Sequence, residues 1–344
     1  MTAVIPGAPS EARWIRSEPR RTLAAPILER IVQTAFPGRH IAEVQPLTDG
    51  FRNANLKIRL DTGDEWIVLR VYEHDASLCQ KEVDLMRLLG GSVPVPDVIH
   101  AEPGGCDNLP PFVLMRYVEG ISLHELKRSG DHGAFAQAAY SAGQTLAVIG
   151  RFTFPRAGWL APGPTVASPL LEGADPTPRF VDLCLASPNL KLRMPAELVD
   201  RTHEFVWSCA SQLAELDRQA CLVHGDFGKR NLLVRPNNAR VNGGRWTVAA
   251  VLDWEFAISA SPLADLGHFL RYERAARAFA EPHFSDGYVH AGGTLPAEWR
   301  RLARLMDLTA LCESLTHDQL PAPVVAELVE LVRATVENRD PVLP

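Results

Sequence analysis

The sequence predicts an α+β protein of two lobes, a small sheet followed by a mainly helical part. Its 344 residues are enough to bury a large core, and chains of this length often divide into two lobes. Short runs rich in β-branched residues lie before residue 118, whereas apolar residues at helical spacing dominate after it. We therefore expect an N-terminal lobe at 1–118 and a helical C-terminal lobe at 119–344.

The N-terminal lobe should contain two helices and a hairpin-rich sheet. Residues 24–36 carry apolar side chains at helical spacing and stop at Pro37 and Gly38. A second helix is expected at 76–91, where the same spacing ends in two glycines. The β-like runs around these helices predict strands at 41–47, 55–60, 65–72, 93–102 and 111–118.

The C-terminal lobe should be helical, with one β-rich insertion at 221–252, where two strand-like runs are joined by a polar loop. Residues 151–178 are rich in Pro and Gly and have no clear period, so we expect an irregular loop or flap there. The periodic segments predict helices at 122–129, 132–150, 195–217, 262–279, 296–318 and 321–337.

Composition and charge exclude several classes of protein. The formal net charge of −6 leaves no basic stripe for a phosphate backbone, so we expect no nucleic-acid partner. The longest apolar stretches are too short to cross a bilayer, and the N-terminus lacks the basic start and apolar core of a secretion signal. Six cysteines without a CxxC pair suit a reduced compartment, so the expected location is cytoplasmic, without a membrane partner.

The stretch CLVHGDFGKRNLLV, residues 221–234, places a polar cluster between two apolar runs. Asp226 and Asn231 should lie at one end of a β-hairpin together with Asp253, which follows the next strand-like run. An amide and a carboxylate suit Mg²⁺, which completes its shell with water and substrate phosphates, while the other carboxylate can accept a proton from a hydroxyl. The alternative is a charged hairpin turn without chemistry. The spacing and order of these residue types favour phosphoryl transfer.

The residues HGDFGKRN followed by VLDWE resemble the catalytic loop and metal-binding segment of the aminoglycoside phosphotransferase and choline kinase family. These enzymes are small-molecule relatives of the protein kinases, whose own pattern is H-R-D-x-x-x-x-N followed by D-F-G. Gly225 stands where protein kinases have Arg, and Trp254 and Glu255 replace Phe-Gly, which favours the small-molecule branch. The resemblance covers about residues 40–320 and implies a bilobal protein-kinase-like fold.

The resemblance implies roles for five residues of the C-terminal lobe. Asp226 would orient and deprotonate the acceptor hydroxyl, and Asn231 and Asp253 would hold Mg²⁺. His224 would brace the loop, and Asp265 would support it from a helix. The other interpretation of His224, as a metal ligand in a hydrolase, finds no further clustered His or Cys to support it.

In the N-terminal lobe, the resemblance implies a nucleotide site. Arg70, where protein kinases carry Lys, would grip the α- and β-phosphates and pair with Glu82 in the following helix. Met115 would sit behind the purine, and the backbones of Arg116 and Val118 would bind its edge. An ordinary surface ion pair is the alternative for Arg70 and Glu82.

Several further residues allow two interpretations each. Asp49, Arg52 and Asn53 lie where a phosphate-covering loop is expected, but their residue types also suit a plain turn. Lys229 and Arg230 lie inside the catalytic loop, where one of them is expected to neutralise the transferring phosphate; the alternative is that they face solvent or substrate. Glu255 is expected either to contact a second metal ion or to cap the following turn.

The expected function is Mg²⁺-dependent transfer of the γ-phosphate of ATP or GTP to a hydroxyl of a small molecule, by a monomer or homodimer. An antibiotic of nucleoside, glycosylated or aminoglycoside type is the favoured acceptor class, and a metabolic kinase for choline, homoserine or a sugar is the alternative. Residues 160–344 contain 23 acidic and 18 basic residues, which is only mildly acidic for a polycationic acceptor. A catalytically silent pseudokinase and a metal-dependent hydrolase rank lower.

Overall fold

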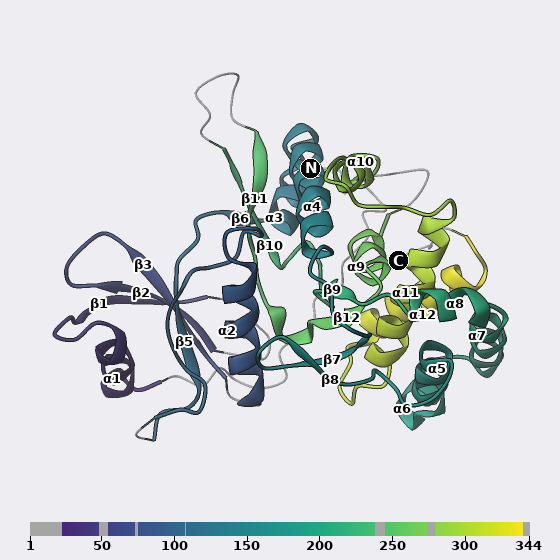
Figure 1. Cartoon of the computed structure of the whole chain (residues 1–344), viewed down its shortest axis with the longest axis horizontal. Coiled ribbons are helices and arrows are strands. Elements are labelled where there is room, and N and C mark those ends of the chain that lie inside the picture. Colours follow the sequence, from purple (N-terminus) through teal and green to yellow (C-terminus); the bar gives the residue numbers. More distant parts are fainter. Residues whose placement is uncertain are drawn as a thin grey trace, which may run out of the picture.

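The computed structural model describes residues 23–47, 54–72, 75–106, 108–237, 245–273 and 279–339. Within these residues, the N-terminal part is a five-stranded antiparallel sheet in the order β1-β2-β3-β5-β4, with helices α1 and α2 beside it (Figure 1). The bounds of these elements are α1 Ala25–Ala35, β1 Ile41–Pro46, β2 Ala54–Leu60, β3 Trp66–Val71, α2 Ser77–Leu89, β4 Val98–Glu102 and β5 Phe112–Arg116.

Two hydrophobic clusters cover the faces of this sheet. The side chains of Ile58, Leu69 and Leu114 pack against α1 in a cluster of their own. Val113 and Met115 on β5 point the other way and join α2 in the large core of the molecule. Because alternate residues of a strand face opposite sides of the sheet, β5 contributes to both clusters. In Figure 1, α2 lies between the sheet and the rest of the chain.

The second part of the chain contains two small sheets among helices. The described strands pair as β11-β10-β6 and as β8-β7-β12-β9. Their bounds are β6 Ile121–Ser122, β7 Gly158–Ala161, β8 Thr165–Ser168, β9 Cys221–Val223, β10 Leu232–Pro236, β11 Trp246–Val251 and β12 Ile258–Ala260, with the 3₁₀ helix η1 at Trp254–Phe256.

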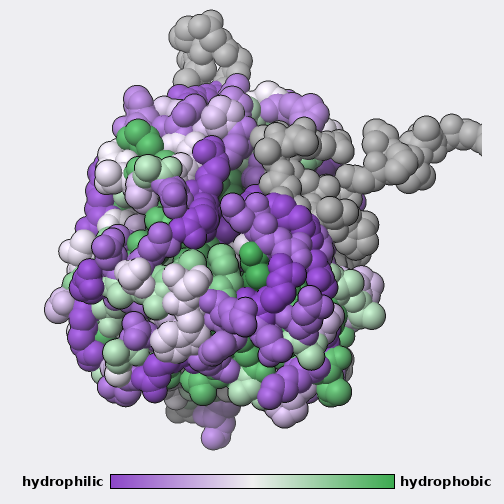
Figure 2. Space-filling view, turned by 90° about the vertical axis from the view of Figure 1, so that its right-hand side faces the viewer, coloured by the Kyte–Doolittle hydropathy of each residue, from purple (hydrophilic) through white to green (hydrophobic). Residues whose placement is uncertain are grey.

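The helices of this part gather on the side away from the five-stranded sheet (Figure 1). They are α3 Leu123–Ser129, α4 His132–Ile149, α5 Pro176–Ala186, α6 Pro188–Arg193, α7 Ala196–Ser208, α8 Ala210–Leu216, α9 Leu263–Leu270, α10 His283–His290, α11 Trp299–Ser314 and α12 Ala322–Val336. The face turned to the viewer in Figure 2 is largely hydrophilic, so polar side chains cover most of this helical surface.

Glycines allow the closest helix contacts. A Cβ atom at Gly287 of α10 would lie 2.0 Å from the carbonyl oxygen of Tyr140 in α4, and one at Gly143 of α4 would lie 2.0 Å from that of Phe284. Gly267 of α9 approaches the carbonyl of Ala303 in α11 in the same way. The helical core is therefore built on backbone contacts that a larger residue would block.

The predicted order of a small sheet followed by helices is confirmed, but several predicted elements have different bounds. The helix predicted at 195–217 is divided at Cys209, whose ψ of 4° leaves the helical region. The helix predicted at 262–279 ends at Leu270, and the carboxylate of Glu273 binds the N–H groups of Phe279 and Ala280 at 2.7 and 3.0 Å. The strand predicted at 93–102 begins only at Val98, because the two prolines before it lack the N–H that a strand donates.

Three helices, the β7–β8 hairpin and the short strands β6 and β12 were missing from the sequence prediction. Segment 151–178 is not irregular throughout, since β7 and β8 pair within it and β7 also pairs with β12, about 100 residues away. The sequence of a four-residue strand carries no signal for a pairing partner so far along the chain. The missed helices are α5, α6 and α10; the first two start at Pro176 and Pro188, a position that favours Pro. No helix among the described residues is long and apolar enough to cross a membrane.

Candidate active site

The loop between β9 and β10 carries the predicted catalytic residues and lies against η1. Gly225 in this loop has a φ of +82°, and a Cβ atom there would lie 2.4 Å from the carbonyl oxygen of Phe256. Only glycine combines this backbone conformation with so close an approach. Gly225 therefore allows the loop to contact the segment that follows β11.

Hydrogen bonds from His224 and Asp265 fix the loop. The carboxylate of Asp265 accepts the backbone N–H of His224 at 2.7 Å and that of Gly225 at 3.0 Å. The ring of His224 accepts the N–H of Asp226 at Nδ1 (3.2 Å), so its proton lies on Nε2, which donates to the carbonyl oxygen of Leu252 at 2.9 Å. His224 is fully buried and acts within this network as a brace between the loop and the end of β11.

Asn231 contacts Asp226 at the end of the same loop. Its Nδ2 atom donates to the Oδ2 atom of Asp226 at 2.8 Å and to the Asp226 carbonyl oxygen at 2.9 Å. The carbonyl oxygen of Asn231 accepts the N–H of Leu252 at 2.9 Å, which ties it to the residue before Asp253. The hairpin β10–β11 therefore brings the three residues to one end, as its register of Leu232 opposite Val251 requires.

The carboxylate of Asp226 is 38% exposed and has a second hydrogen-bond donor, the Nε2 atom of His268 at 3.0 Å. Burial raises the pKa of Asp226, but the hydrogen bonds that its carboxylate accepts from His268 and Asn231 act in the opposite direction and lower it. The net effect places the pKa below the ordinary value, so the side chain is a carboxylate at neutral pH.

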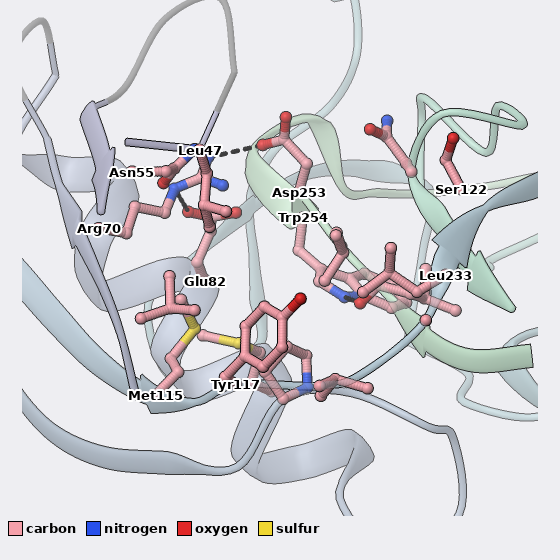
Figure 3. Close-up of a pocket in the computed structure, with 18 of the residues that line it drawn as sticks. Leu47, Asn55, Arg70, Glu82, Met115, Tyr117, Ser122, Leu233, Asp253 and Trp254 are labelled. Atoms are coloured by element: carbon pink, nitrogen blue, oxygen red, sulfur yellow. Dashed lines mark hydrogen bonds and ion pairs between the residues drawn. The ribbon is translucent and has the colours of Figure 1, made fainter. Parts of the chain in front are cut away.

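Arg70 of β3 and Glu82 of α2 meet Asp253 at the junction of the two parts of the chain (Figure 3). The guanidinium of Arg70 lies 3.2 Å from Glu82, 2.6 Å from Asp253 and 3.7 Å from Glu255. Burial raises the pKa of Glu82, and the charge of Arg70 opposes this. One buried guanidinium therefore lies within 4 Å of three carboxylates.

Lys81 of α2 and Tyr72, which follows β3, complete this cluster. The Lys81 ammonium donates to the carbonyl oxygens of Glu255 at 2.7 Å and Ala257 at 3.2 Å, and the Tyr72 hydroxyl donates to Glu82. Burial lowers the pKa of Lys81, while the carboxylates of Glu82 and Glu255 oppose this. The segment after Asp253 is thus attached to α2 by main-chain as well as side-chain contacts.

A cavity of about 350 Å³ opens beside this cluster, between the five-stranded sheet and the β10–β11 hairpin. Its volume lies within the usual range for small-molecule sites. Arg70, Asn231 and Asp253 form its polar end. Apolar side chains line its other walls, namely Val68, Met86, Met115, Leu233 and Val251. Figure 3 shows Met115 and Tyr117 across the cavity from Asp253.

Met115, Arg116 and Val118, which were predicted to contact the purine, all line this cavity. They belong to the connection between the two lobes, called the hinge below. Arg116 already donates its N–H to the carbonyl oxygen of Asp97 at 2.9 Å, so the prediction that its backbone binds the purine edge cannot involve this donor. The neighbouring N–H of Tyr117 donates to the carbonyl oxygen of Trp66 at 3.1 Å. Val118 lies two residues after the end of β5, where the chain crosses toward β6.

One of these open interpretations is decided by a side-chain contact. Lys229 is buried and donates to the carbonyl oxygen of Phe269 at 2.6 Å, so its ammonium group does not face solvent in this structure. Arg230 lines the cavity, and its phosphate role stays a prediction. Glu255 is buried and lies 3.7 Å from Arg70, and both interpretations of it stay predictions. Asp49, Arg52 and Asn53 fall outside the described residues.

His268, Lys81 and Tyr72 belong to the site but were not among the predicted residues. His268 lies three residues after Asp265 in α9, and Lys81 lies directly before Glu82 in α2. Both could have been found by looking at the helix neighbours of the predicted site residues. Tyr72 lies two residues after Arg70, on the same side of the extended chain.

The donor atoms of the site fit a magnesium ion better than a closed metal centre. Among the described residues, no group of three or more His, Cys, Asp or Glu side chains is arranged to hold a metal ion. Asn231 and Asp253 offer one amide and one carboxylate at the polar end of the cavity. This small oxygen set suits Mg²⁺, which takes most of its other ligands from water and phosphate.

Comparisons with known proteins agree with this geometry. The model of the phosphotransferase enzyme family matches residues 43–305. Acyl-CoA dehydrogenase family member 11 of Rattus norvegicus is 43% identical over 56 residues, which are 16% of this chain and only 6% of the length of that relative.

Two solved structures illustrate the fold. Aminoglycoside phosphotransferase APH(4)-Ia, as a thermostable mutant in a ternary complex with AMP-PNP and hygromycin B, has a TM-score of 0.64 and 19% identity over 90% of this chain and 97% of its own. The GDP and kanamycin complex of APH(2")-IIIa has a TM-score of 0.62 and 20% identity over 90% and 98%. At this identity the likeness shows a common fold, which is protein-kinase-like and bilobal.

Proposed function

Because this chain belongs to the phosphotransferase enzyme family, and is therefore a small-molecule kinase, we propose that it moves the γ-phosphate of ATP or GTP to a hydroxyl of a small molecule. The observation that carries the proposal is the continuity of the site. One cavity has apolar walls at the hinge and ends at Arg70, Asn231 and Asp253. Asp226 adjoins that end through its hydrogen bond with Asn231.

The apolar part of the cavity suits a purine. Val68 and Leu233 line its walls, and Met115 lies on the hinge strand β5. Since the Arg116 N–H is already used, we propose that the purine edge binds the carbonyl oxygen of Arg116 and the backbone of Val118. In this arrangement the phosphates extend toward Arg70, and residues 1–118 act as the nucleotide-binding lobe against 119–344.

The polar end suits a triphosphate. Glu82 holds Arg70 by an ion pair of 3.2 Å, with only 10% of the arginine side chain exposed, so its guanidinium is oriented before a ligand arrives. Asn231 and Asp253 would hold Mg²⁺, which supplies positive charge to the β- and γ-phosphates when bound. Arg52 and Asn53 remain proposed phosphate contacts.

We assign the proton transfer to Asp226. Its carboxylate is ionised and partly exposed, and two donors fix its orientation. An acceptor hydroxyl placed beside it would donate a hydrogen bond to the carboxylate and transfer its proton to it as the new P–O bond forms. The bond between the γ-phosphorus and the bridging oxygen of the β-phosphate would break in the same step, so that ADP or GDP leaves. The transfer would be direct and in line, with the acceptor oxygen attacking the γ-phosphorus on the side opposite the leaving nucleoside diphosphate.

For the acceptor we propose a hydroxylated antibiotic, of nucleoside, glycosylated or aminoglycoside type. The structural neighbours carry aminoglycosides, namely hygromycin B and kanamycin, in their complexes. The slight acidic excess of residues 160–344 is weak support for a polycation, so less charged antibiotics stay in the proposal.

All six cysteines are described and none forms a disulfide, which supports a cytoplasmic location.

A mass-spectrometric screen of hydroxylated compounds tests this proposal. The purified chain with Mg²⁺ and ATP or GTP is incubated with aminoglycosides, nucleoside antibiotics, macrolides, choline and homoserine. We expect a mass gain of one phosphate on one compound class. Asp226→Asn should lower the rate by about 10²- to 10⁴-fold, the usual contribution of a general base, while nucleotide binding stays nearly unchanged.

The matched control is Asp200→Asn, an exposed aspartate on α7, which should transfer phosphate at the wild-type rate. Full activity of Asp226→Asn would contradict the assignment of the base. Absence of nucleotide binding in the wild-type protein would contradict the proposal as a whole.

A further inference from the structure

His268 connects the proposed base with a buried ion pair on the far side of its ring. It lies on α9, three residues after Asp265, so one face of this helix contacts both the backbone and the side chain of the catalytic loop. Its Nε2 atom lies 3.0 Å from the Oδ1 atom of Asp226, and its side chain is 17% exposed. The family resemblance assigns no role to this position.

The other ring nitrogen determines where the proton of His268 lies. The Nδ1 atom is 3.0 Å from the Nη2 atom of Arg271. A guanidinium nitrogen can only donate, so Nδ1 must accept this bond and cannot carry a hydrogen. The ring proton therefore lies on Nε2 and points at the carboxylate of Asp226.

Arg271 is itself held in place. Its Nε and Nη2 atoms donate to the two carboxylate oxygens of Asp307 at 2.8 and 2.7 Å. The side chains of Arg271 and Asp307 are 11% and 5% exposed, and such a bidentate pair has a defined geometry. Because Asp307 lies on α11, this pair orients the His268 ring from a second helix.

We propose that His268 is a positioning residue for phosphoryl transfer, a neutral imidazole that fixes the carboxylate of Asp226 by donating from Nε2. This rests on the proposed function of Asp226. Asn231 donates to Oδ2 while His268 donates to Oδ1, so the plane of the carboxylate is fixed by one donor on each oxygen. Each oxygen keeps a further lone pair for the acceptor hydroxyl. His268 takes no proton through Nε2, because that nitrogen already carries one.

The first test is long-range ¹H–¹⁵N NMR of the nucleotide-free full chain at neutral pH, with the His268 signals assigned from the His268→Gln variant. We expect one neutral tautomer, with the hydrogen on Nε2. A hydrogen on Nδ1, or a ring charged on both nitrogens, would overturn the proposal. This measurement needs no acceptor, so it does not depend on the kinase assignment.

The second test compares His268→Ala with His268→Gln, because a carboxamide can donate to Asp226 and accept from Arg271 as the imidazole does. With the acceptor found in the screen, we expect His268→Ala to lower kcat about 10- to 100-fold, the cost of a misplaced reacting group, while the KM for nucleotide changes little. His268→Gln should recover most of the rate.

The matched control is His203→Ala, which removes an exposed histidine 2.7 Å from Asp182, far along the helical part. It should leave kcat unchanged. If His268→Gln is as slow as His268→Ala at equal melting temperature, the positioning role is wrong. Failure of the kinase proposal has another signature, in which the wild-type protein itself transfers no phosphate to any compound.

Discussion

At the scale of single residues, the most demanding position is Arg70. Its side chain is 10% exposed and lies between Glu82, Asp253 and Glu255. Burial lowers the pKa of Arg70, but the charges of Glu82 and Asp253 raise it by more, so the net shift is upward. The guanidinium therefore stays charged, and its planar fork of N–H groups can contact several carboxylate oxygens at once.

We expect Arg70→Met to lower the free energy of unfolding by about 3–5 kcal/mol, because it leaves buried carboxylates without their partner. It should also raise the KM for nucleotide. Chemical denaturation and steady-state kinetics measure the two effects.

The matched control is Arg59→Met, which breaks the half-exposed pair of Arg59 with Glu43 and should change neither quantity appreciably. Equal losses of stability in the two variants would contradict the role given to burial.

A second prediction concerns Asp265, which accepts two backbone N–H groups with its two oxygens. In Asp265→Asn one acceptor is replaced by an NH₂ group, which faces a donor. We expect a loss of about 1–3 kcal/mol in the free energy of unfolding, the cost of leaving a buried donor without an acceptor.

The pH dependence of this loss has a definite sign. Burial raises the pKa of Asp265 in the folded state, although His224 opposes this. A carboxyl group with a raised folded pKa contributes stability that is fully present below its unfolded pKa of about 3.9 and is lost as the pH rises through the folded pKa. The advantage of the wild type over Asp265→Asn should therefore shrink from about pH 4 upward in urea titrations. An advantage that grows with pH would contradict it.

At the scale of elements, the position of the catalytic loop depends on a turn that only glycine fits. Gly225 and Gly38 have nearly the same positive φ, +82° and +79°. A Cβ atom at Gly225 would meet the Phe256 carbonyl oxygen at 2.4 Å, whereas none of the described atoms lies within 4 Å of one at Gly38. A side chain at either position would therefore meet the same backbone strain, but only at Gly225 would it also collide with a neighbouring atom.

We expect Gly38→Ala to cost about 1–2 kcal/mol, the usual penalty for a side chain in the left-handed region. Gly225→Ala should cost clearly more and should also lower phosphate transfer, because the loop must move away from η1. Urea denaturation of the two variants and the panel assay measure these effects. Equal costs in stability would show that the collision is relieved without moving the loop.

Helix α2 is the element that connects the two parts of the site. Glu82 contacts Arg70 on the sheet, and Lys81 donates to carbonyl oxygens of Glu255 and Ala257, on either side of the end of η1. Neighbouring residues of one helix therefore contact both the phosphate-binding side chain and the segment after Asp253. This explains why two charged residues of α2 are buried at its centre.

At the scale of the whole molecule, the cavity lies where the sheet and the helical part meet, so its walls come from both. Val68 and Met115 belong to the sheet, and Leu233 and Val251 belong to the hairpin across from it. A ligand that contacts both walls binds only the folded arrangement. Its binding should therefore stabilise the whole chain.

We expect saturating ATP or GTP with Mg²⁺ to raise the melting temperature. A nucleotide at about 100 times its Kd contributes roughly 2.7 kcal/mol, which corresponds to several degrees for a chain of this size. Differential scanning fluorimetry with each nucleotide also ranks ATP against GTP. The Arg70→Met variant should show a smaller shift, and no shift in the wild type with either nucleotide would contradict the assignment of the cavity.

The order of the elements and the grouping of polar residues at the loop could be predicted from the sequence alone. The sheet followed by helices, the helix that carries Glu82 and the hairpin that joins Asn231 to Asp253 all follow from periodicity and from short spacings, which local backbone geometry converts directly into position. Asp226 could be singled out by its spacing from Asn231 and Asp253, whereas Gly225 was noted only through the family resemblance.

Contacts between segments far apart in the chain could not be predicted, because they depend on how the elements pack. His268 meets Asp226 over 42 residues and Arg70 meets Asp253 over 183, and the amino group of Lys229 turns to the carbonyl of Phe269. The pairing of β7 with β12 belongs to the same class. Sequence spacing predicts which side chains share a helix face or a strand. The partner of a buried polar group depends instead on how whole elements pack, because such a group must form its hydrogen bond with whatever lies beside it in the folded chain.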